Sequence, residues 1–462
     1  MRSNTSLPKN TKTPDPDDPQ GNDTIVAPAT PPGRGGIAIV RLSGPLCEQI
    51  AIALTGVLAN PRVASRCGFA RDDGSAMDHG LSIYFPAPNS YTGESVLELH
   101  THGSPVVVQM VIQRCLQLGA RMARPGEFSE RAFLSGQLDL AQAESVADLI
   151  ASGTEAAARS AVNALQGEFS RHVHSLVDNL TRLRIYVEAA IDFPDEEIDF
   201  LADQQVIQQL EGLQLTFAEL RRSMGQGRLL RDGLRVVLTG APNAGKSSLL
   251  NLLAKEQRAI VSEIPGTTSD VLEQHLDFDG LPVLLVDTAG IREAIDSIEE
   301  EGVRRARAQQ QLADLIVLVA DHSAPIGENA ESIQKSMPDI PIVTVYNKID
   351  LSGKVAEVIE DEIYLSALTG EGVQGLVEKL KQVAGYRGVD SSQFIARQRH
   401  IDVLDRAKLH LDQGVDQLTQ FQAGELLAEE LKLAQQALGE ITGEVTSDDL
   451  LGLIFSSFCI GK

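Results

Sequence analysis

A glycine-rich octapeptide, GAPNAGKS at residues 240–247, decides the fold class of this chain. The apolar run LRVVLT at 234–239 precedes it and is typical of a buried strand, and SLLNLL at 248–253 follows it and opens a helix. The octapeptide fits the pattern GxxxxGK[ST], in which glycines let backbone N–H groups approach phosphate oxygens closely. The N-terminus of the following helix adds its dipole to that cradle. We therefore predict a P-loop α/β domain around this stretch.

Four further motifs follow the octapeptide in a fixed order: GTT at 266–268, DTAG at 287–290, NKID at 347–350 and SAL at 366–368. In NKID, the carboxylate of Asp350 can accept hydrogen bonds from the N1 and N2 groups of guanine. Adenine offers no such pair, so the wrong base would leave a buried carboxylate unpaired. The five motifs together predict a GTP-binding domain, in which SAL closes the base pocket through its backbone.

The residue types of these motifs suggest roles in phosphate and magnesium binding. Lys246 is expected to reach the β- and γ-phosphates, and the Ser247 hydroxyl is expected to bind Mg²⁺. Thr268 is the expected second protein ligand of Mg²⁺, and Asp287, after the strand VLLV, is placed to hold the magnesium shell. Gly290 can turn its N–H toward the γ-phosphate and respond to its loss.

The position that follows DTAG lacks the usual catalytic side chain. Ras-like enzymes orient the attacking water with a glutamine there, whereas this chain has Ile291. The catalytic polar group must therefore come from elsewhere. The acidic run at 296–301, which contains Glu299, is a local supply, although such a run is also typical of a solvated helix face.

Composition limits the function classes. The net charge of −24 argues against bulk, nonspecific nucleic-acid binding, and it leaves room for a local basic patch that contacts one RNA. The four cysteines are scattered without metal-binding or disulfide spacing. No apolar run is long enough to span a membrane, and the N-terminus lacks the apolar core of a signal peptide, so we expect a cytoplasmic protein without a membrane partner.

The period of the apolar residues divides the chain into segments. Residues 1–21 are polar and proline-rich, which predicts a disordered tail, and residues 22–137 mix short strands with a helix at 106–118, which predicts an α+β domain. Helical spacing dominates 138–230 and 386–462, on either side of the GTPase segment at 231–385. Amphipathic helices need partners, so we predict one all-helical domain into which the P-loop domain is inserted. Two separate bundles are the alternative.

Segments outside the nucleotide motifs carry a family resemblance. They are DTIVA at 23–27, TPPGRGG at 30–36, PNSYTGE at 88–94, RPGEFSERAF at 124–133, IDFP at 191–194 and the terminal FCIGK at 458–462. With them, the chain resembles the MnmE (TrmE) family of tRNA modification GTPases over almost its whole length. The resemblance implies an N-terminal folate-binding and dimerisation domain, a helical domain and an inserted Ras-like GTPase domain.

The resemblance also implies an activity and partners. Family members act with the flavoprotein MnmG, in a heterotetramer, to add a carboxymethylaminomethyl-type group at carbon 5 of the wobble uridine of certain tRNAs. A 5-formyl- or methylene-tetrahydrofolate supplies the one-carbon unit. Similar proteins are homodimers through the N-terminal domain, and GTP hydrolysis drives a cycle in which their GTPase domains dimerise.

Family members use K⁺ in place of an arginine finger, because charge that builds up between the β- and γ-phosphates needs a cation there. The resemblance assigns K⁺ to the side chain of Asn243 and the carbonyls of Ser262, Ile264 and Thr267, and it makes Glu299 the residue that positions the hydrolytic water. The full set of expected nucleotide-binding residues is then Asn243, Ala244, Gly245, Lys246, Ser247, Ser248, Ser262, Glu263, Ile264, Pro265, Gly266, Thr267, Thr268, Asp287, Thr288, Ala289, Gly290, Asn347, Lys348, Asp350, Ser366, Ala367 and Leu368.

The resemblance places a folate site in the N-terminal domain, lined by Arg41, Glu98, Gln137 and Lys462. A carboxylate suits the amino-pyrimidine edge of the pterin, and cations suit the glutamate tail. Many relatives carry a basic residue where this chain has Gln137, a loss for which a cation such as Arg34 could compensate. Taken by themselves, Arg41 is also typical of a surface ion pair and Glu98 of a half-buried strand end.

Cys459 is assigned as a reactive thiol at the reaction centre, and the alternative is a small apolar anchor.

Two other functions of the chain stay open at this point. One is an RNA-binding assembly GTPase, although such proteins usually append basic domains that this acidic chain lacks. The other is a folate-dependent transferase in which the GTPase is regulatory.

Overall fold

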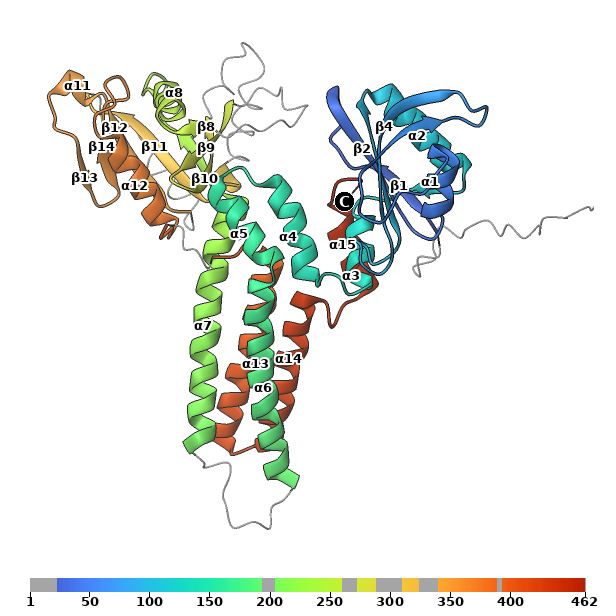
Figure 1. The fold of residues 1–462 in the computed structure, drawn as a ribbon. Coiled ribbons are helices and arrows are strands. Elements are labelled where there is room, and N and C mark those ends of the chain that lie inside the picture. Colours follow the sequence, from blue (N-terminus) through green and yellow to red (C-terminus); the bar gives the residue numbers. More distant parts are fainter. Residues whose placement is uncertain are drawn as a thin grey trace, which may run out of the picture. The chain divides into compact units, whose positions relative to one another are not determined.

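The computed structural model describes residues 23–192, 204–259, 272–287, 310–323, 340–388 and 393–461; the tail expected at 1–21 lies outside these ranges. The described chain divides into two units. The first contains the chain up to Ala147 together with the segment from Thr446 onward, and the second contains Asp148 to Val445. Figure 1 shows the elements of each unit.

The first unit is an α+β domain built on a six-stranded sheet in the order β3-β4-β5-β2-β1-β6. Neighbouring strands are antiparallel except β1 and β6. Alternate residues of β2 and β5 pack with α1 and α2 into one apolar core, which confirms the predicted class. The elements are β1 (Ile25–Pro28), β2 (Gly35–Ser43), α1 (Cys47–Thr55), β3 (Ser65–Ala70), β4 (Ala76–Phe85), β5 (Val96–Gly103), α2 (Pro105–Gln117), β6 (Arg121–Met122) and α3 (Glu127–Leu134).

The C-terminal segment lies in the first unit from Thr446 onward, together with most of α4, so both ends of the predicted helical segments 138–230 and 386–462 group there. Helix α15 (Asp448–Ser456) is short and apolar, and its Phe455 packs with Leu140 of α4 (Leu140–Ala151). The backbone approach is close, since a Cβ added to Gly126 would lie 2.5 Å from the carbonyl oxygen of Phe455. Helix α15 therefore packs both on α4, which the sequence placed in the helical domain, and close to the start of α3.

Four long helices form the helical part of the second unit, and they lie side by side in Figure 1. They are α6 (Glu168–Asp192), α7 (Gln204–Asp232), α13 (Gln398–Phe421) and α14 (Gly424–Thr442), and α5 (Glu155–Leu165) precedes them. The predicted apolar stripe of α6, which includes Leu176 and Leu180, is fully buried, as are Leu404 and Leu411 of α13. Helices from both sides of the P-loop segment therefore cover each other, which confirms the inserted arrangement.

The P-loop part of the second unit contains an eight-stranded sheet in the order β13-β14-β12-β11-β7-β10-β9-β8. The strands from β14 to β10 in this order are parallel, so their carboxyl ends share one edge. The elements are β7 (Leu234–Thr239), α8 (Lys246–Glu256), β8 (Arg258–Ala259), β9 (Leu272–Phe278), β10 (Leu281–Asp287), β11 (Leu315–Asp321), β12 (Ile342–Asn347), α11 (Ile349–Ser352), β13 (Glu357–Ile359), β14 (Glu362–Tyr364) and α12 (Val373–Val383).

A buried carboxylate ties together the two places where the chain passes between the helical and P-loop parts. Asp148 accepts from Arg231 Nε at 2.9 Å, and Arg231 precedes β7 by three residues. Asp148 also accepts from Arg397 Nη2 at 2.8 Å and from Arg397 Nε at 3.2 Å, and Arg397 caps α13. Within the described ranges, none of the helices combines the length and apolar character needed to cross a membrane.

Candidate functional site

The P-loop is a tight turn between β7 and α8 that depends on two glycines. Gly240 has φ of +142°, and a Cβ there would lie 2.1 Å from the carbonyl oxygen of Val319. Gly245 has φ of +97°, and a Cβ there would lie 2.2 Å from Asn347 Nδ2. Side chains at these positions would meet both strain and collision, which is the physical reason for glycine in this pattern. The loop therefore presents its backbone at the N-terminus of α8.

Two polar side chains of α8 begin the phosphate and magnesium site. The ammonium of Lys246 is buried and donates to the carbonyl oxygens of Gly240 at 3.0 Å and Ala241 at 2.9 Å, which holds it against the loop. The hydroxyl of Ser247 donates to Asp287 Oδ2 at 2.9 Å, and Asp287 is fully buried. The structure thus brings together the hydroxyl and carboxylate oxygens that suit Mg²⁺.

Asn347 connects three of the predicted motifs through one buried amide. Its Nδ2 donates to the carbonyl oxygen of Ala244 at 2.9 Å in the P-loop. Its Oδ1 accepts from the backbone N–H of Lys348 at 2.8 Å and of Ala367 at 2.9 Å. Because both faces of the amide are satisfied, Asn347 fixes the distance between the phosphate loop and the two predicted base loops.

The carboxylate of Asp350 lies at the exposed rim of this arrangement. Its Oδ1 accepts from Ser366 Oγ at 2.5 Å, and Ser366 Oγ accepts in turn from the backbone N–H of Thr369 at 3.2 Å. Ala367 is buried while Leu368 is 84% exposed. The structure therefore places Asp350 beside the SAL loop, with its carboxylate oriented by Ser366.

A charged residue that belongs to none of the sequence motifs, Asp321, also lies at this sheet edge. Asp321 ends β11, and its Oδ2 accepts from Lys348 Nζ at 2.7 Å. The hydrogen bond from Lys348, with further ones from the hydroxyl and backbone of Ser323, lowers the pKa of Asp321 to about 2. An acid at the end of an otherwise apolar strand was the available signal.

Several predicted residues lie outside the described ranges, and their assignments stay predictions. They include the expected potassium loop, the switch residues after Asp287, the water-positioning glutamate and the terminal lysine. These are Ser262, Glu263, Ile264, Pro265, Gly266, Thr267, Thr268, Thr288, Ala289, Gly290, Glu299 and Lys462.

In the first unit, the pairing of β2 with β5 brings Arg41 and Glu98 together. Arg41 Nε donates to Glu98 Oε1 at 3.0 Å, and the register pairs the two residues directly. The guanidinium of Arg41 lies 5.6 Å from the ring centroid of Tyr91 and 5.9 Å from that of Phe128. Arg41 therefore forms the ion pair that the alternative interpretation describes, on an aromatic surface. Gln137 is exposed beside the loop at 88–94.

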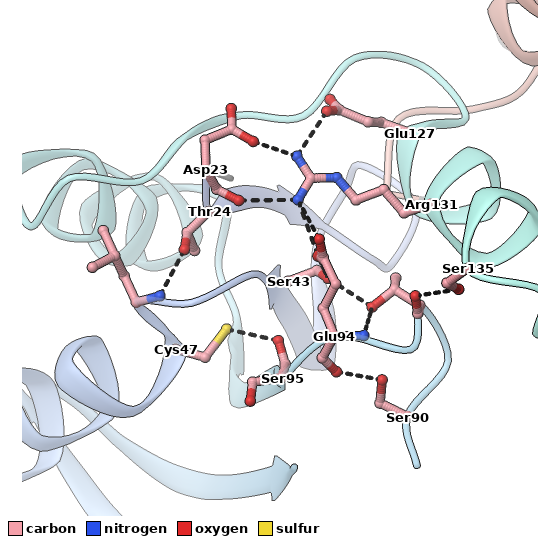
Figure 2. A network of polar contacts seen from close by, with 12 residues as sticks. Asp23, Thr24, Ser43, Cys47, Ser90, Glu94, Ser95, Glu127, Arg131 and Ser135 are labelled. Atoms are coloured by element: carbon pink, nitrogen blue, oxygen red, sulfur yellow. Dashed lines mark hydrogen bonds and ion pairs between the residues drawn. The ribbon is translucent and has the colours of Figure 1, made fainter. Parts of the chain in front are cut away.

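A partly buried ionic network lies in the same unit, and Figure 2 shows Arg131 at its centre. Arg131 donates to Asp23 Oδ1 at 2.6 Å, to Glu94 Oε2 at 3.0 Å and to Glu127 Oε1 at 3.1 Å. Arg121 also donates to Glu127, through Nη1 at 2.8 Å. Apart from Arg121, these residues come from three segments of the family resemblance, so the network holds those segments together.

Burial would raise the pKa of Glu127, but hydrogen bonds from Arg121 and from the backbone of Arg124, with the charges of Arg121 and Arg131, lower it to about 2.

The cysteines differ in exposure. Burial raises the pKa of the Cys47 and Cys115 thiols to about 12, whereas Cys459 is exposed.

Two family models match the chain. The model described as GTP-binding protein TrmE N-terminus matches residues 24–137, and the model described as MnmE helical domain matches residues 140–459. Among solved structures, the G domain of the T. maritima FeoB iron transporter is 27% identical over 33% of this chain and 98% of that chain, with a TM-score of 0.25.

Curated relatives match along nearly the whole chain. A tRNA modification GTPase MnmE from Stutzerimonas stutzeri (strain A1501) is 55% identical over 95% of this chain and 99% of the relative. A protein of the same name from Histophilus somni (strain 129Pt) is 52% identical over the same shares of the two chains. The chain therefore belongs to the family of tRNA modification GTPases called MnmE, and it is a GTP hydrolase.

Proposed function

We propose that this chain is a K⁺-dependent GTPase that acts in the cytoplasm with the flavoprotein MnmG, as a heterotetramer, to modify carbon 5 of the wobble uridine of certain tRNAs. One observation carries the proposal: the described nucleotide motifs converge at one sheet edge in a chain whose full-length relatives are named tRNA modification GTPases. The product is a carboxymethylaminomethyl-type uridine, with a 5-formyl- or methylene-tetrahydrofolate as the one-carbon source.

In this proposal the nucleotide motifs bind GTP by a division of tasks. Lys246 and the P-loop backbone hold the β- and γ-phosphates, and Asp350 accepts from the guanine edge. Ser247 and Thr268 bind Mg²⁺, which would neutralise phosphate charge, and Asp287 orients the Ser247 hydroxyl through their 2.9 Å hydrogen bond. The Ser247 and Asp287 oxygens are the hard donors that this ion prefers.

Catalysis is proposed to use a monovalent cation and a glutamate. K⁺ on Asn243, Ser262, Ile264 and Thr267 would supply positive charge where negative charge builds up between the phosphates. The family resemblance suggests Glu299 as the residue that positions the hydrolytic water, since the side chain after DTAG, Ile291, has no polar atom to do so.

Both assignments can be tested by kinetics. GTP turnover should rise strongly when Na⁺ is replaced by K⁺ at equal ionic strength, and Asn243→Ala should remove that rise. Equal rates of the unaltered protein in both salts would refute the cation assignment. Glu299→Ala should abolish hydrolysis with near-normal GTP binding; if binding falls as much as the rate, Glu299 is structural.

The first unit is proposed to bind the folate and to form the homodimer, while GTP hydrolysis drives dimerisation of the GTPase domains. Arg41, Glu98, Gln137 and Lys462 would line the folate site. The cation and the carboxylate already adjoin each other, with Arg41 Nη2 2.9 Å from Glu98 Oε1. Cys459 is exposed, which a reactive thiol requires.

Mass spectrometry of tRNA nucleosides tests the proposed function. Deletion of the gene should remove the carboxymethylaminomethyl-type wobble uridine, and the unaltered gene on a plasmid should restore it. Unchanged wobble uridines after deletion would refute the modification role and would leave the RNA-binding assembly GTPase as the better interpretation.

A further inference from the structure

Asp321 lies at the sheet edge that carries the nucleotide motifs, although it belongs to none of them. It is the only charged residue of β11, whose other positions are apolar. The register of the parallel pair β11–β12 places Asp321 directly opposite Asn347, the first residue of NKID. The fold thus puts an acid beside the predicted base loop.

The two carboxylate oxygens of Asp321 have different partners. Oδ1 accepts from the backbone N–H of Ser323 at 2.9 Å and from its hydroxyl at 2.6 Å, which closes a local turn. Oδ2 accepts from Lys348 Nζ at 2.7 Å. The side chains of Asp321 and Lys348 are 23% and 30% exposed. Because the turn fixes the carboxylate, Oδ2 is oriented for Lys348 before any ligand binds.

Lys348 has a backbone conformation that needs support. Its φ is +67°, in the left-handed region that disfavours a lysine, and it stands directly before α11. His322, the residue after β11, contacts this segment at two further points. Its backbone N–H donates to the carbonyl oxygen of Asn347 at 2.9 Å, and its Nδ1 lies 2.9 Å from Ser352 Oγ. The segment from Asn347 to Ser352, which includes α11, is therefore held at both ends by the residue that follows β11.

We propose that Asp321 is a positioning residue for guanine recognition. By holding the side chain of Lys348, it maintains the left-handed turn at that residue, and it thereby fixes the direction in which Asp350, two residues later, presents its carboxylate. Asp321 acts through Lys348 and does not itself touch the base. The inference rests on the proposed assignment of Asp350 to the guanine edge.

Nucleotide binding by the full-length protein tests this role. The dissociation constants of GDP and of inosine diphosphate, whose base lacks the 2-amino group, should be measured for Asp321→Ala and Asp321→Asn. Asp321→Ala should weaken GDP binding about tenfold, as expected for loss of a charged hydrogen bond, and should narrow the preference for GDP over inosine diphosphate. Asp321→Asn keeps an acceptor for Ser323 but loses the charge, so its dissociation constant for GDP should lie between those of the unaltered protein and Asp321→Ala.

Two further variants make the outcome decisive. Asp361 stands just before β14, and its Oδ1 lies 2.8 Å from Lys379 Nζ. Asp361→Ala therefore removes another aspartate–lysine pair of the same domain, and it should change neither dissociation constant. Asp350→Asn should shift selectivity toward xanthosine diphosphate. Suppose that Asp350→Asn shows this shift, but that Asp321→Ala keeps the normal ratio of the GDP and inosine diphosphate dissociation constants. The positioning role of Asp321 is then wrong, even if both nucleotides bind more weakly. If Asp350→Asn causes no shift, the base assignment fails and the inference fails with it.

Discussion

Gly245 shows how one residue joins the phosphate loop to the base loop. Its φ of +97° and its contact with Asn347 Nδ2 leave no room for a side chain. Asn347 donates from that same nitrogen to Ala244. The glycine that lets the backbone approach phosphate therefore also lets the base loop approach the P-loop.

Gly245→Ala should weaken nucleotide binding more than backbone strain alone can explain. The left-handed conformation costs about 1–2 kcal/mol for a non-glycine residue. The new Cβ would in addition push Asn347 from its hydrogen bond, so the dissociation constant of a fluorescent GDP analogue should rise more than about tenfold. Gly385→Ala is the matched control, because its φ is +70° and a Cβ there would meet nothing within 4 Å. Equal effects of the two substitutions would contradict this account.

At this scale the sequence could predict which motif residues lie close together, but not which other residues hold them in place. Lys246, Ser247 and Asp287 could be predicted because the order of motifs along parallel strands places them at one edge. Asp321 could not, because its role depends on the register of β11 against β12. The number of residues between a single acid at the end of an apolar strand and the NKID motif is not fixed, so no sequence pattern connects the two.

Among the elements, α15 packs on both α4 and α3, and its sequence could not predict both of these surfaces. Helical spacing shows that an apolar stripe needs a cover, but it does not show which surface provides that cover. Phe455 and Phe458 of the C-terminal segment are buried with Leu140 and Ala143, within the first unit. The long stripes of α6, α13 and α14 were easier to predict, because only other long helices could bury them.

Asp148 gives a prediction at the scale of elements, since it joins α4, the end of α7 and the start of α13. Its side chain is 6% exposed, so Asp148→Ala should lower stability by about 3 kcal/mol, the cost of breaking a buried ion pair. Hydrogen exchange should quicken in peptides covering Arg231 and Arg397. GDP affinity should stay near normal, because the P-loop contacts do not involve this carboxylate.

Asp405→Ala provides the control for this element-scale effect. Asp405 pairs with Arg221 at 2.7 Å, but the side chains are 49% and 43% exposed, so its loss should cost less than about 1 kcal/mol. Similar hydrogen exchange and similar thermal stability in the two variants would contradict this account. The Asp148 ion pairs would then not stabilise the two places where the chain passes between the helical and P-loop parts.

At the scale of the whole molecule, the first unit contains an interior network of paired charges. The chain carries a net charge of −24, yet Arg121 and Arg131 are both committed to the interior network of Asp23, Glu94 and Glu127. When a carboxylate of this network becomes protonated, it loses the negative charge that pairs with the arginines. Acid should therefore weaken the first unit through these particular carboxylates, in addition to its general effect on surface charge.

Glu127 sets the sign and the pH window of that effect. Its pKa falls from 4.5 to about 2 on folding, so its contribution to stability is present above pH 4.5 and is lost as the pH falls toward 2. The contribution is about 3 kcal/mol. Glu127→Gln should destabilise the first unit at pH 7 and flatten its pH dependence between 4.5 and 2, as measured by urea unfolding with pulse hydrogen-exchange labelling of peptides from α3. Glu429→Gln removes an exposed pair with Lys432 and should change neither property. An unchanged acid response in Glu127→Gln would show that other carboxylates control it.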